Sequence, residues 1–146
     1  MTREERKKRK QYRKFNKKYK KELVEIVKKH YGPYDNFLGD FFCVMVQHWK
    51  DYYKLGYNVW GVEIKDTPEF NDPTHPTRYE IACELERRYN EWFDFNIFDK
   101  DKPTTVKEEF LLPDGKINYE LANQRERELK KSFFDYYMQY SVDMWD

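Results

Sequence analysis

The spacing of apolar residues predicts helices along most of the chain. In the first thirty residues they recur every three or four positions, which places them on one stripe of a helix. The members of this stripe are Tyr12, Phe15, Tyr19, Leu23, Ile26 and Val27. Thr2 and Glu5 have the spacing of a capping box, so the helix is expected to begin almost at the first residue. Because proline cannot continue a helix, Gly32-Pro33 predicts a sharp break between residues 30 and 36.

A second helix is predicted over residues 36–55, and apolar residues lie on every side of it. The run Phe41-Phe42-Cys43-Val44-Met45-Val46 leaves no polar face. A helix that is apolar all round is buried all round, so we expect this helix at the centre of the fold. The residues that follow, 57–65, fit either a short strand or an extended connection.

Three more helices are predicted after a loop that is rich in proline. Thr77 and Glu80 form a second capping box, which opens a helix over residues 78–93. Thr105 opens a short helix, and Asn118 caps a long final one that runs to about residue 142. The side chains expected to be mostly buried come from the second helix, from the helix over residues 78–93 and from the final helix. They are Phe41, Met45, Trp49, Leu85, Tyr89, Leu129, Phe133 and Tyr137.

Composition supports a helical fold whose core is built from aromatic rings. Aromatic residues make up 19% of the chain and charged residues 38%, with 5 Gly and 6 Pro, too few for a turn-rich β-sandwich. The predicted fold class is therefore all-α. It has four or five helices around a buried, aromatic-rich central helix, a long basic N-terminal helix, and at most a minor β element near residues 57–65.

The net charge of +1 conceals an uneven distribution. Residues 1–21 hold 12 Lys and Arg against 2 Glu, whereas the other 125 residues hold 16 Lys and Arg against 25 Asp and Glu. We therefore divide the single domain into a basic amphipathic helix, residues 1–31, and an acidic helical body, residues 34–146. The candidate binding residues form one row of cations with no carboxylate among them: Arg6, Lys7, Lys10, Arg13, Lys14, Lys17 and Lys21.

A row of cations of this kind suits a polyphosphate backbone, because each neutralised phosphate releases a counterion. It equally suits an acidic protein surface or an anionic lipid, or the acidic body of the same chain. Ordinary solvated helix faces mix both signs of charge, and this face does not. Nucleic acid or a nucleic-acid-bound protein is the expected partner. A membrane is not an expected partner, and no apolar run approaches the length of a membrane span.

No catalytic site, metal site or cofactor is predicted. The Glu63-Ile64-Lys65 tripeptide has the pattern of half a metal-dependent nuclease site, but no second strand is predicted to supply the acidic partner. The three histidines are scattered, and neither Cys43 nor Cys83 has a zinc-ligand spacing to any of them. Both thiols are expected to be free.

The body has an order of aromatic motifs that resembles small accessory proteins, of no assigned activity, encoded by tailed bacteriophages. The motifs are Trp49-Lys-Asp51-Tyr52-Tyr53, Gly56-Tyr-Asn-Val59-Trp60 and the closing Trp145-Asp146. The resemblance spans residues 36–146 and transfers no site residue. It implies a non-enzymatic, phage-encoded binder of host proteins, phage assemblies or nucleic acid. Because the sequence has no run of membrane-span length, the expected location is the host cytoplasm or, after packaging, a virion.

The leading hypothesis is thus a non-catalytic binding protein that contacts its target through the basic N-terminal helix. One alternative is a phage inhibitor of a host defence protein, whose acidic body would occupy a nucleic-acid groove through Glu80, Glu84, Glu91 and Asp94. A structural protein of the virion or of its assembly is the third. Tyr and Trp favour interfaces, so aromatic residues of the C-terminal helix also form a candidate homo-oligomer interface: Phe134, Tyr136, Tyr140 and Trp145.

Overall fold

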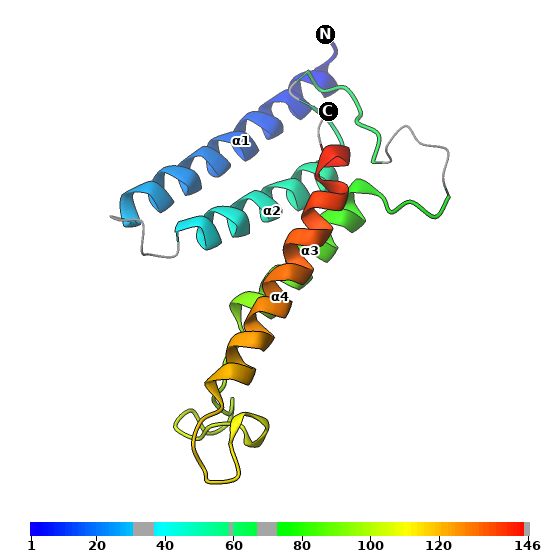
Figure 1. Cartoon of the computed structure of the whole chain (residues 1–146). Helices are drawn as coiled ribbons and strands as arrows, with labels where there is room; N and C mark the ends of the chain where they lie inside the picture. Colours follow the sequence, from blue (N-terminus) through cyan, green and yellow to red (C-terminus); the bar gives the residue numbers. More distant parts are fainter. Residues whose placement is uncertain (31–36, 59, 67–72, 145–146) are drawn as a thin grey trace. The chain divides into compact units, whose positions relative to one another are not determined.

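The computed structural model describes residues 1–30, 37–58, 60–66 and 73–144, and these residues form an all-α fold (Figure 1). The α-helices are α1 (Arg3–Lys29), α2 (Phe37–Leu55), α3 (Arg78–Phe93) and α4 (Tyr119–Tyr140). Two 3-10 helices, η1 (Glu108–Phe110) and η2 (Ser141–Met144), complete the order. The predicted fold class is confirmed. The β content of the described residues consists of isolated bridges, one of which joins Tyr57 to Glu63.

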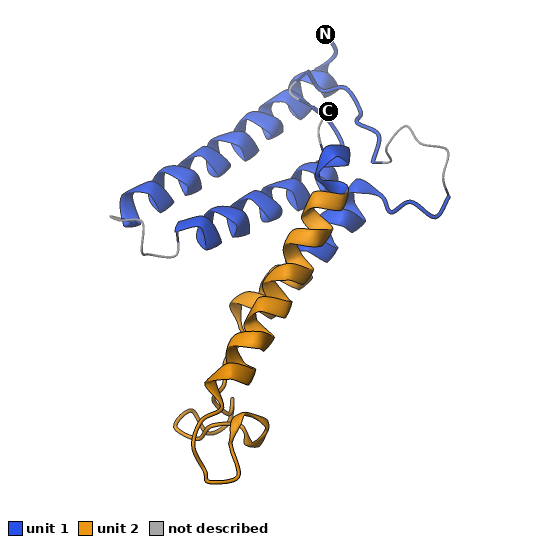
Figure 2. Ribbon diagram, viewed as in Figure 1, with its two compact units in different colours: residues 1–86, 140–146 blue, residues 87–139 orange. Residues whose placement is uncertain are grey.

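The chain divides into two compact units, which are described separately (Figure 2). The first comprises residues 1–86 and 140–146, and the second comprises residues 87–139. The basic helix α1 therefore belongs to the same unit as α2. No helix among the described ranges is long and apolar enough to cross a membrane.

Helix α1 begins and ends where the sequence predicts. The Thr2 side chain accepts a hydrogen bond from the Glu5 amide at 3.1 Å, and Glu5 accepts one from the Thr2 amide at 2.6 Å, so the capping box is confirmed. At the other end His30 is extended, with φ −102° and ψ 127°. The helix has thus stopped by residue 30. Gly32-Pro33, which predicted the break, lies outside the described residues.

Aromatic rings hold α1 against α2, which runs antiparallel beside it (Figure 1). The His48 ring of α2 stacks on Tyr19 at a centroid distance of 3.7 Å and on Phe15 at 4.6 Å. Tyr12 meets Tyr52 edge-on at 6.2 Å. The predicted stripe therefore faces α2. Val27 is an exception at 62% exposed, because it lies at the edge of the stripe.

Helix α2 is not buried on every side, so this expectation was wrong. Gly39, Val46 and Tyr53 are its buried residues, whereas Cys43 and Leu38 are exposed, Leu38 to 66%. The physical reason is that α1 covers one face of α2, and a chain of this size supplies few further layers. Phe41, Met45 and Trp49, all predicted to be mostly buried, are only partly buried.

The rest of the first unit is joined by polar contacts as well as by packing. At the end of α1, Asp40 of α2 accepts hydrogen bonds from His30 at 2.7 Å and Lys29 at 3.2 Å. Tyr53 donates a buried hydrogen bond to the Met144 carbonyl oxygen at 3.0 Å. These contacts fix both ends of α2. The buried side chains Ile81, Ala82 and Leu85 come from the first turns of α3.

The second unit is built around Phe133, which is fully buried. Tyr89 and Trp92 of α3 meet it at ring-centroid distances of 5.9 and 6.0 Å. Phe110 of η1 is also buried and meets Phe95 edge-on at 5.9 Å. Burial of Leu85, Tyr89 and Phe133 is confirmed, while Leu129 and Tyr137 are only partly buried.

The sequence predicted the capping residues of α3 and α4 correctly, but not that of η1. The amide of Glu80 donates to Thr77 Oγ1 and the amide of Leu121 donates to Asn118 Oδ1, both at 3.1 Å, as expected of capping residues. Thr105 does not cap the short helix. The helix η1 begins two residues later than predicted, so Lys107 occupies its cap position, and the lysine side chain has no acceptor with which to make a capping bond.

Candidate functional site

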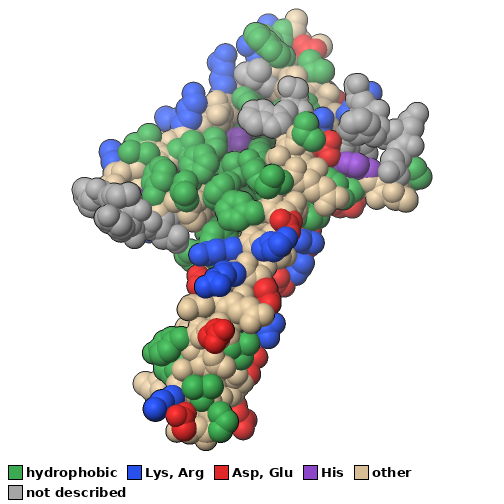
Figure 3. All heavy atoms as spheres, viewed as in Figure 1, with side chains coloured by type: hydrophobic (Ala, Val, Ile, Leu, Met, Phe, Trp, Pro, Cys, Tyr) green, Lys and Arg blue, Asp and Glu red, His purple; other side chains and the backbone are tan. Residues whose placement is uncertain are grey.

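The candidate site is the basic row on α1, defined as Arg6, Lys7, Lys10, Arg13, Lys14, Lys17 and Lys21. All seven side chains are exposed. At 100° per residue they share about a third of the helix circumference, and at about 1.5 Å per residue they extend over about 22 Å. Figure 3 shows Lys and Arg side chains projecting along the outer edge of α1. The structure thus brings the predicted residues together on one surface.

Most cations of the basic row have no carboxylate partner among the described residues. Lys21 is paired with Glu25 at 3.9 Å. Within residues 1–30, 37–58, 60–66 and 73–144, no carboxylate lies within 4.0 Å of the other six. Neighbouring like charges at three- and four-residue spacing destabilise a helix by about 0.2–0.5 kcal/mol per pair. The row therefore carries an electrostatic cost that a bound anion would relieve.

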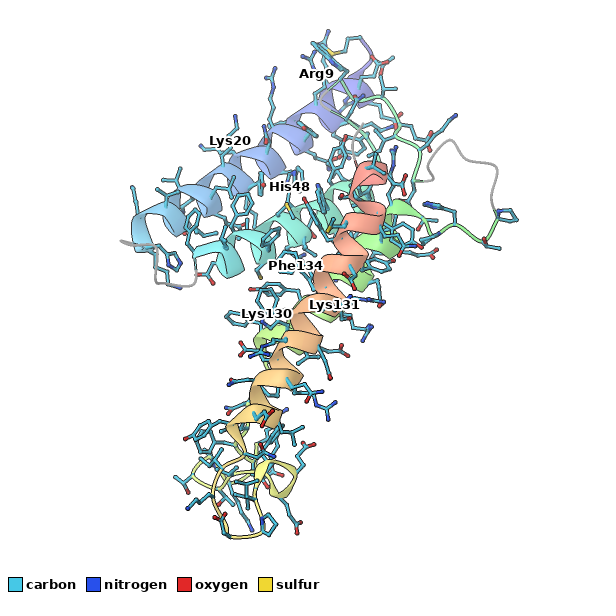
Figure 4. The ribbon with its side chains drawn as sticks, viewed as in Figure 1. Arg9, Lys20, His48, Lys130, Lys131 and Phe134 are labelled. Carbon is cyan, nitrogen blue, oxygen red and sulfur yellow. The ribbon has the colours of Figure 1, made fainter. Side chains whose placement is uncertain are left out.

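Helix α4 gives the contrast within the same chain. Its cations alternate with acids, and Arg125, Lys130 and Lys131 each pair with a carboxylate of the same helix. Lys130 also lies over the Trp92 ring, 5.6 Å from the centroid. Figure 4 labels Lys130 and Lys131 on this helix. The cations of α4 have the mixed pattern of an ordinary solvated face, so the pattern of α1 does not follow from a lysine-rich composition alone.

The N-terminal half of the row borders a cationic cleft. This shallow cleft, of about 420 Å³, is lined by Met1, Arg6, Arg9, Lys10 and Arg13. The four cations have the spacing i, i+3, i+4 and i+7, which places them on one stripe of the helix. Arginine guanidinium groups present several donors in a fixed plane and bind phosphate oxygens in pairs. The cleft is therefore suited to a phosphate group.

The first turns of α1 contact Tyr57 and Gly61 of the connection that follows α2. Buried Tyr57 donates a hydrogen bond to Gln11 Oε1, and Lys8 lies 5.8 Å from the centroid of its ring. Gly61 has φ +78°, and a Cβ there would stand 3.2 Å from the Glu5 carbonyl oxygen. This position needs glycine for both its backbone conformation and its close approach to α1.

Two residues beside the basic row were missed by sequence reasoning. Arg9 lies in the cationic cleft, near the N-terminal end of α1 (Figure 4), and its guanidinium stands over the Trp60 ring at 5.5 Å. Trp60 is 66% exposed. Arg9 falls at the edge of the helical face, so its position gave no signal. Trp60 is a lone aromatic residue in a connection, and only the fold places it next to the cations.

The other candidate chemistry finds no support in the part of the chain that the structure describes. No three His, Cys, Asp or Glu residues there are grouped so as to hold a metal ion. Glu63 lies in an isolated bridge, and no named strand supplies a sheet around it. Cys43 and Cys83 are both free thiols, as expected. Burial lowers the pKa of His48 to about 4, and its ring serves in packing.

The aromatic residues proposed as an oligomer interface make contacts within their own chain. Phe134 packs on Trp92 at 5.8 Å, Tyr136 lies under the Arg88 guanidinium at 4.5 Å, and Tyr140 meets His75 at 5.5 Å. All three are partly buried. Trp145 lies outside the described residues. A homo-oligomer through this helix therefore stays a prediction.

No known protein family matches the chain, and no curated protein and no solved structure is significantly similar to it. The resemblance to phage accessory proteins likewise stays a prediction.

Proposed function

We propose that the protein is a nucleic-acid-binding protein whose basic row on α1 contacts the phosphate backbone. The observation that carries this proposal is a row of exposed cations with six members unpaired among the described residues. These cations stand on a helix that is capped at Thr2, packs against α2 and is hydrogen-bonded to Tyr57. A preordered row of this kind binds a polyanion without first paying to order the chain.

Phosphate contact predicts how binding should depend on salt. Each phosphate that is neutralised on a single strand contributes about −0.7 to the slope of log affinity against log salt, and about −0.9 on a duplex. A slope of several units is expected if most of the basic row is engaged. Protein recognition through a few charges would give a shallower dependence.

Replacing Lys10, Arg13, Lys14 and Lys17 together by Glu is expected to lower affinity for nucleic acid at 0.1 M salt by at least about a hundredfold. The salt slope should fall by roughly one unit per lost contact. Fluorescence anisotropy with a labelled oligonucleotide measures both quantities. The thermal melt should stay nearly unchanged, because these four side chains are exposed.

The matched control is a fourfold variant with the same change in net charge elsewhere: Lys65, Lys100, Lys102 and Arg127 to Glu. These side chains are also exposed, and no ion pair joins them to another described residue. The control should bind almost as well as the original protein. Equal loss in both variants would reduce the effect to net charge and contradict a site on α1. If the α1 variant instead unfolds, the basic row stabilises the fold of its own chain, and this outcome would contradict the proposed role in binding.

A further inference from the structure

Trp60 is exposed to solvent, and its backbone amide is hydrogen-bonded to Asn58. The side chain of Asn58 accepts hydrogen bonds from the Trp60 amide at 2.9 Å and the Val62 amide at 3.2 Å. The Asn58 amide also donates to the Val62 carbonyl oxygen, and the Gly61 amide donates to the Asn58 carbonyl oxygen, both at 2.9 Å. Described residues on both sides of Val59 are thus hydrogen-bonded to one another, and Tyr57 and Gly61 contact α1. The Trp60 indole lies beside the cationic cleft, because Arg9 both lines the cleft and stands over the ring.

The surroundings of Trp60 combine an aromatic ring face with nearby cations. The Arg9 guanidinium stands over the Trp60 ring, 5.5 Å from its centroid, and Trp60 is 66% exposed. Arg9 itself lines the cleft and donates to Met1 Sδ at 3.2 Å. One guanidinium covers one face of an indole, so the exposed surface leaves room for a second planar group.

From this juxtaposition we propose that the site takes single-stranded nucleic acid, with one unpaired base stacked on Trp60 and the adjoining phosphates bound by Arg6, Lys10 and Arg13. The inference rests on the proposed function and adds the substrate class. Bases in a duplex are already stacked on their neighbours, whereas an unpaired base has a face to offer. Proteins that bind single strands combine a cationic groove with aromatic rings in this way.

Arg9 is a positioning residue in this arrangement. Its guanidinium stabilises one ring face by a cation–π contact, and it lies between the indole and the cations that bind phosphate. Gly61 has a similar role, because its close approach to Glu5 keeps the turn against α1. The distance between ring and cleft is therefore set by the fold.

The test compares three ligands: a single-stranded oligothymidylate of about 20 nucleotides, a duplex of the same length, and inorganic polyphosphate of similar charge, which has no bases. Trp60→Ala is expected to weaken binding of the single strand by about 5- to 150-fold, the range for loss of one stacked base. Binding of polyphosphate should change by less than about twofold. The salt slope should stay the same, because no phosphate contact is removed.

Two further variants separate stacking from simple packing. Trp60→Phe keeps an aromatic face and should retain most of the affinity, whereas Trp60→Leu keeps apolar bulk without one and should bind as weakly as Trp60→Ala. Val62→Ala is the matched control, since Val62 is 59% exposed on the same turn. It should bind like the original protein.

The outcomes distinguish this inference from the proposed function. If the original protein binds none of the three ligands, both fail. If it binds single strand and duplex alike and Trp60→Ala changes neither, the nucleic-acid function stands and base stacking is overturned. Equal losses for the single strand and for polyphosphate would also overturn it, because Trp60 would then serve only to hold α1.

Discussion

Replacing Phe133 by alanine is expected to lower the free energy of unfolding by about 3–5 kcal/mol, the range for removing a phenylalanine from a core that cannot collapse around the cavity. Phe133 is 0% exposed. Its ring lies among Tyr89, Trp92 and Phe134, at centroid distances of 5.9, 6.0 and 5.2 Å. These rigid rings cannot easily refill the space. A loss of this size is a large part of the 5–15 kcal/mol that stabilises a typical domain.

Denaturant unfolding followed by circular dichroism measures this loss directly. Met138→Ala is the matched control, because Met138 stands on the same helix and is 76% exposed. It should change the stability by less than about 0.5 kcal/mol. Similar stabilities for the two variants would contradict the burial of Phe133. Phe41→Ala is expected to cost less than Phe133→Ala, since Phe41 is only partly buried.

Acidification is expected to destabilise the protein through His48. Burial lowers the pKa of His48 from 6.5 to about 4 in the folded state, and the charge of Asp51 opposes this only in part. Between pH 6.5 and pH 4, His48 is therefore mostly protonated in the unfolded chain and mostly neutral in the folded chain. The stabilising contribution is complete above pH 6.5 and is lost as the pH falls to 4. Allowing for solvent screening of a partly exposed ring, the loss is about 2–3 kcal/mol.

His48→Phe is the variant that tests this assignment. Phenylalanine keeps an aromatic ring against Phe15 and Tyr19 and cannot be protonated. The difference in unfolding free energy between pH 7 and pH 4 should shrink by about 2–3 kcal/mol in the variant. Burial acts to raise the pKa of Asp40, but hydrogen bonds from His30 and Lys29 outweigh it and lower that pKa. Asp40 therefore also loses its contribution to stability at low pH. Its effect is common to both proteins, so it cancels. An unchanged difference would assign the pH dependence to other groups.

The sequence by itself determined which parts of the chain form the helices and where several of the helices begin. The start of α1 after Thr2 and the start of α3 after Thr77 follow from capping residues that accept hydrogen bonds from amides three positions away. The face of α1 that meets α2 follows from the spacing of its rings, and the opposite face from the spacing of its cations. These features depend on residues close together in the chain, so a local pattern is enough to predict them.

The tertiary structure alone decided which apolar surfaces are covered and what surrounds the basic row. Residues 41–46 are apolar on every side of α2, yet Cys43 is exposed, because burial depends on how many other elements reach the helix. Trp60 is 51 positions from Arg9 in the chain, and the contacts of Tyr57 and Gly61 with α1 bring the two side chains together. Contacts between such distant residues leave no periodic signal in the sequence. For this reason the position of Trp60 beside the cationic cleft could not be predicted.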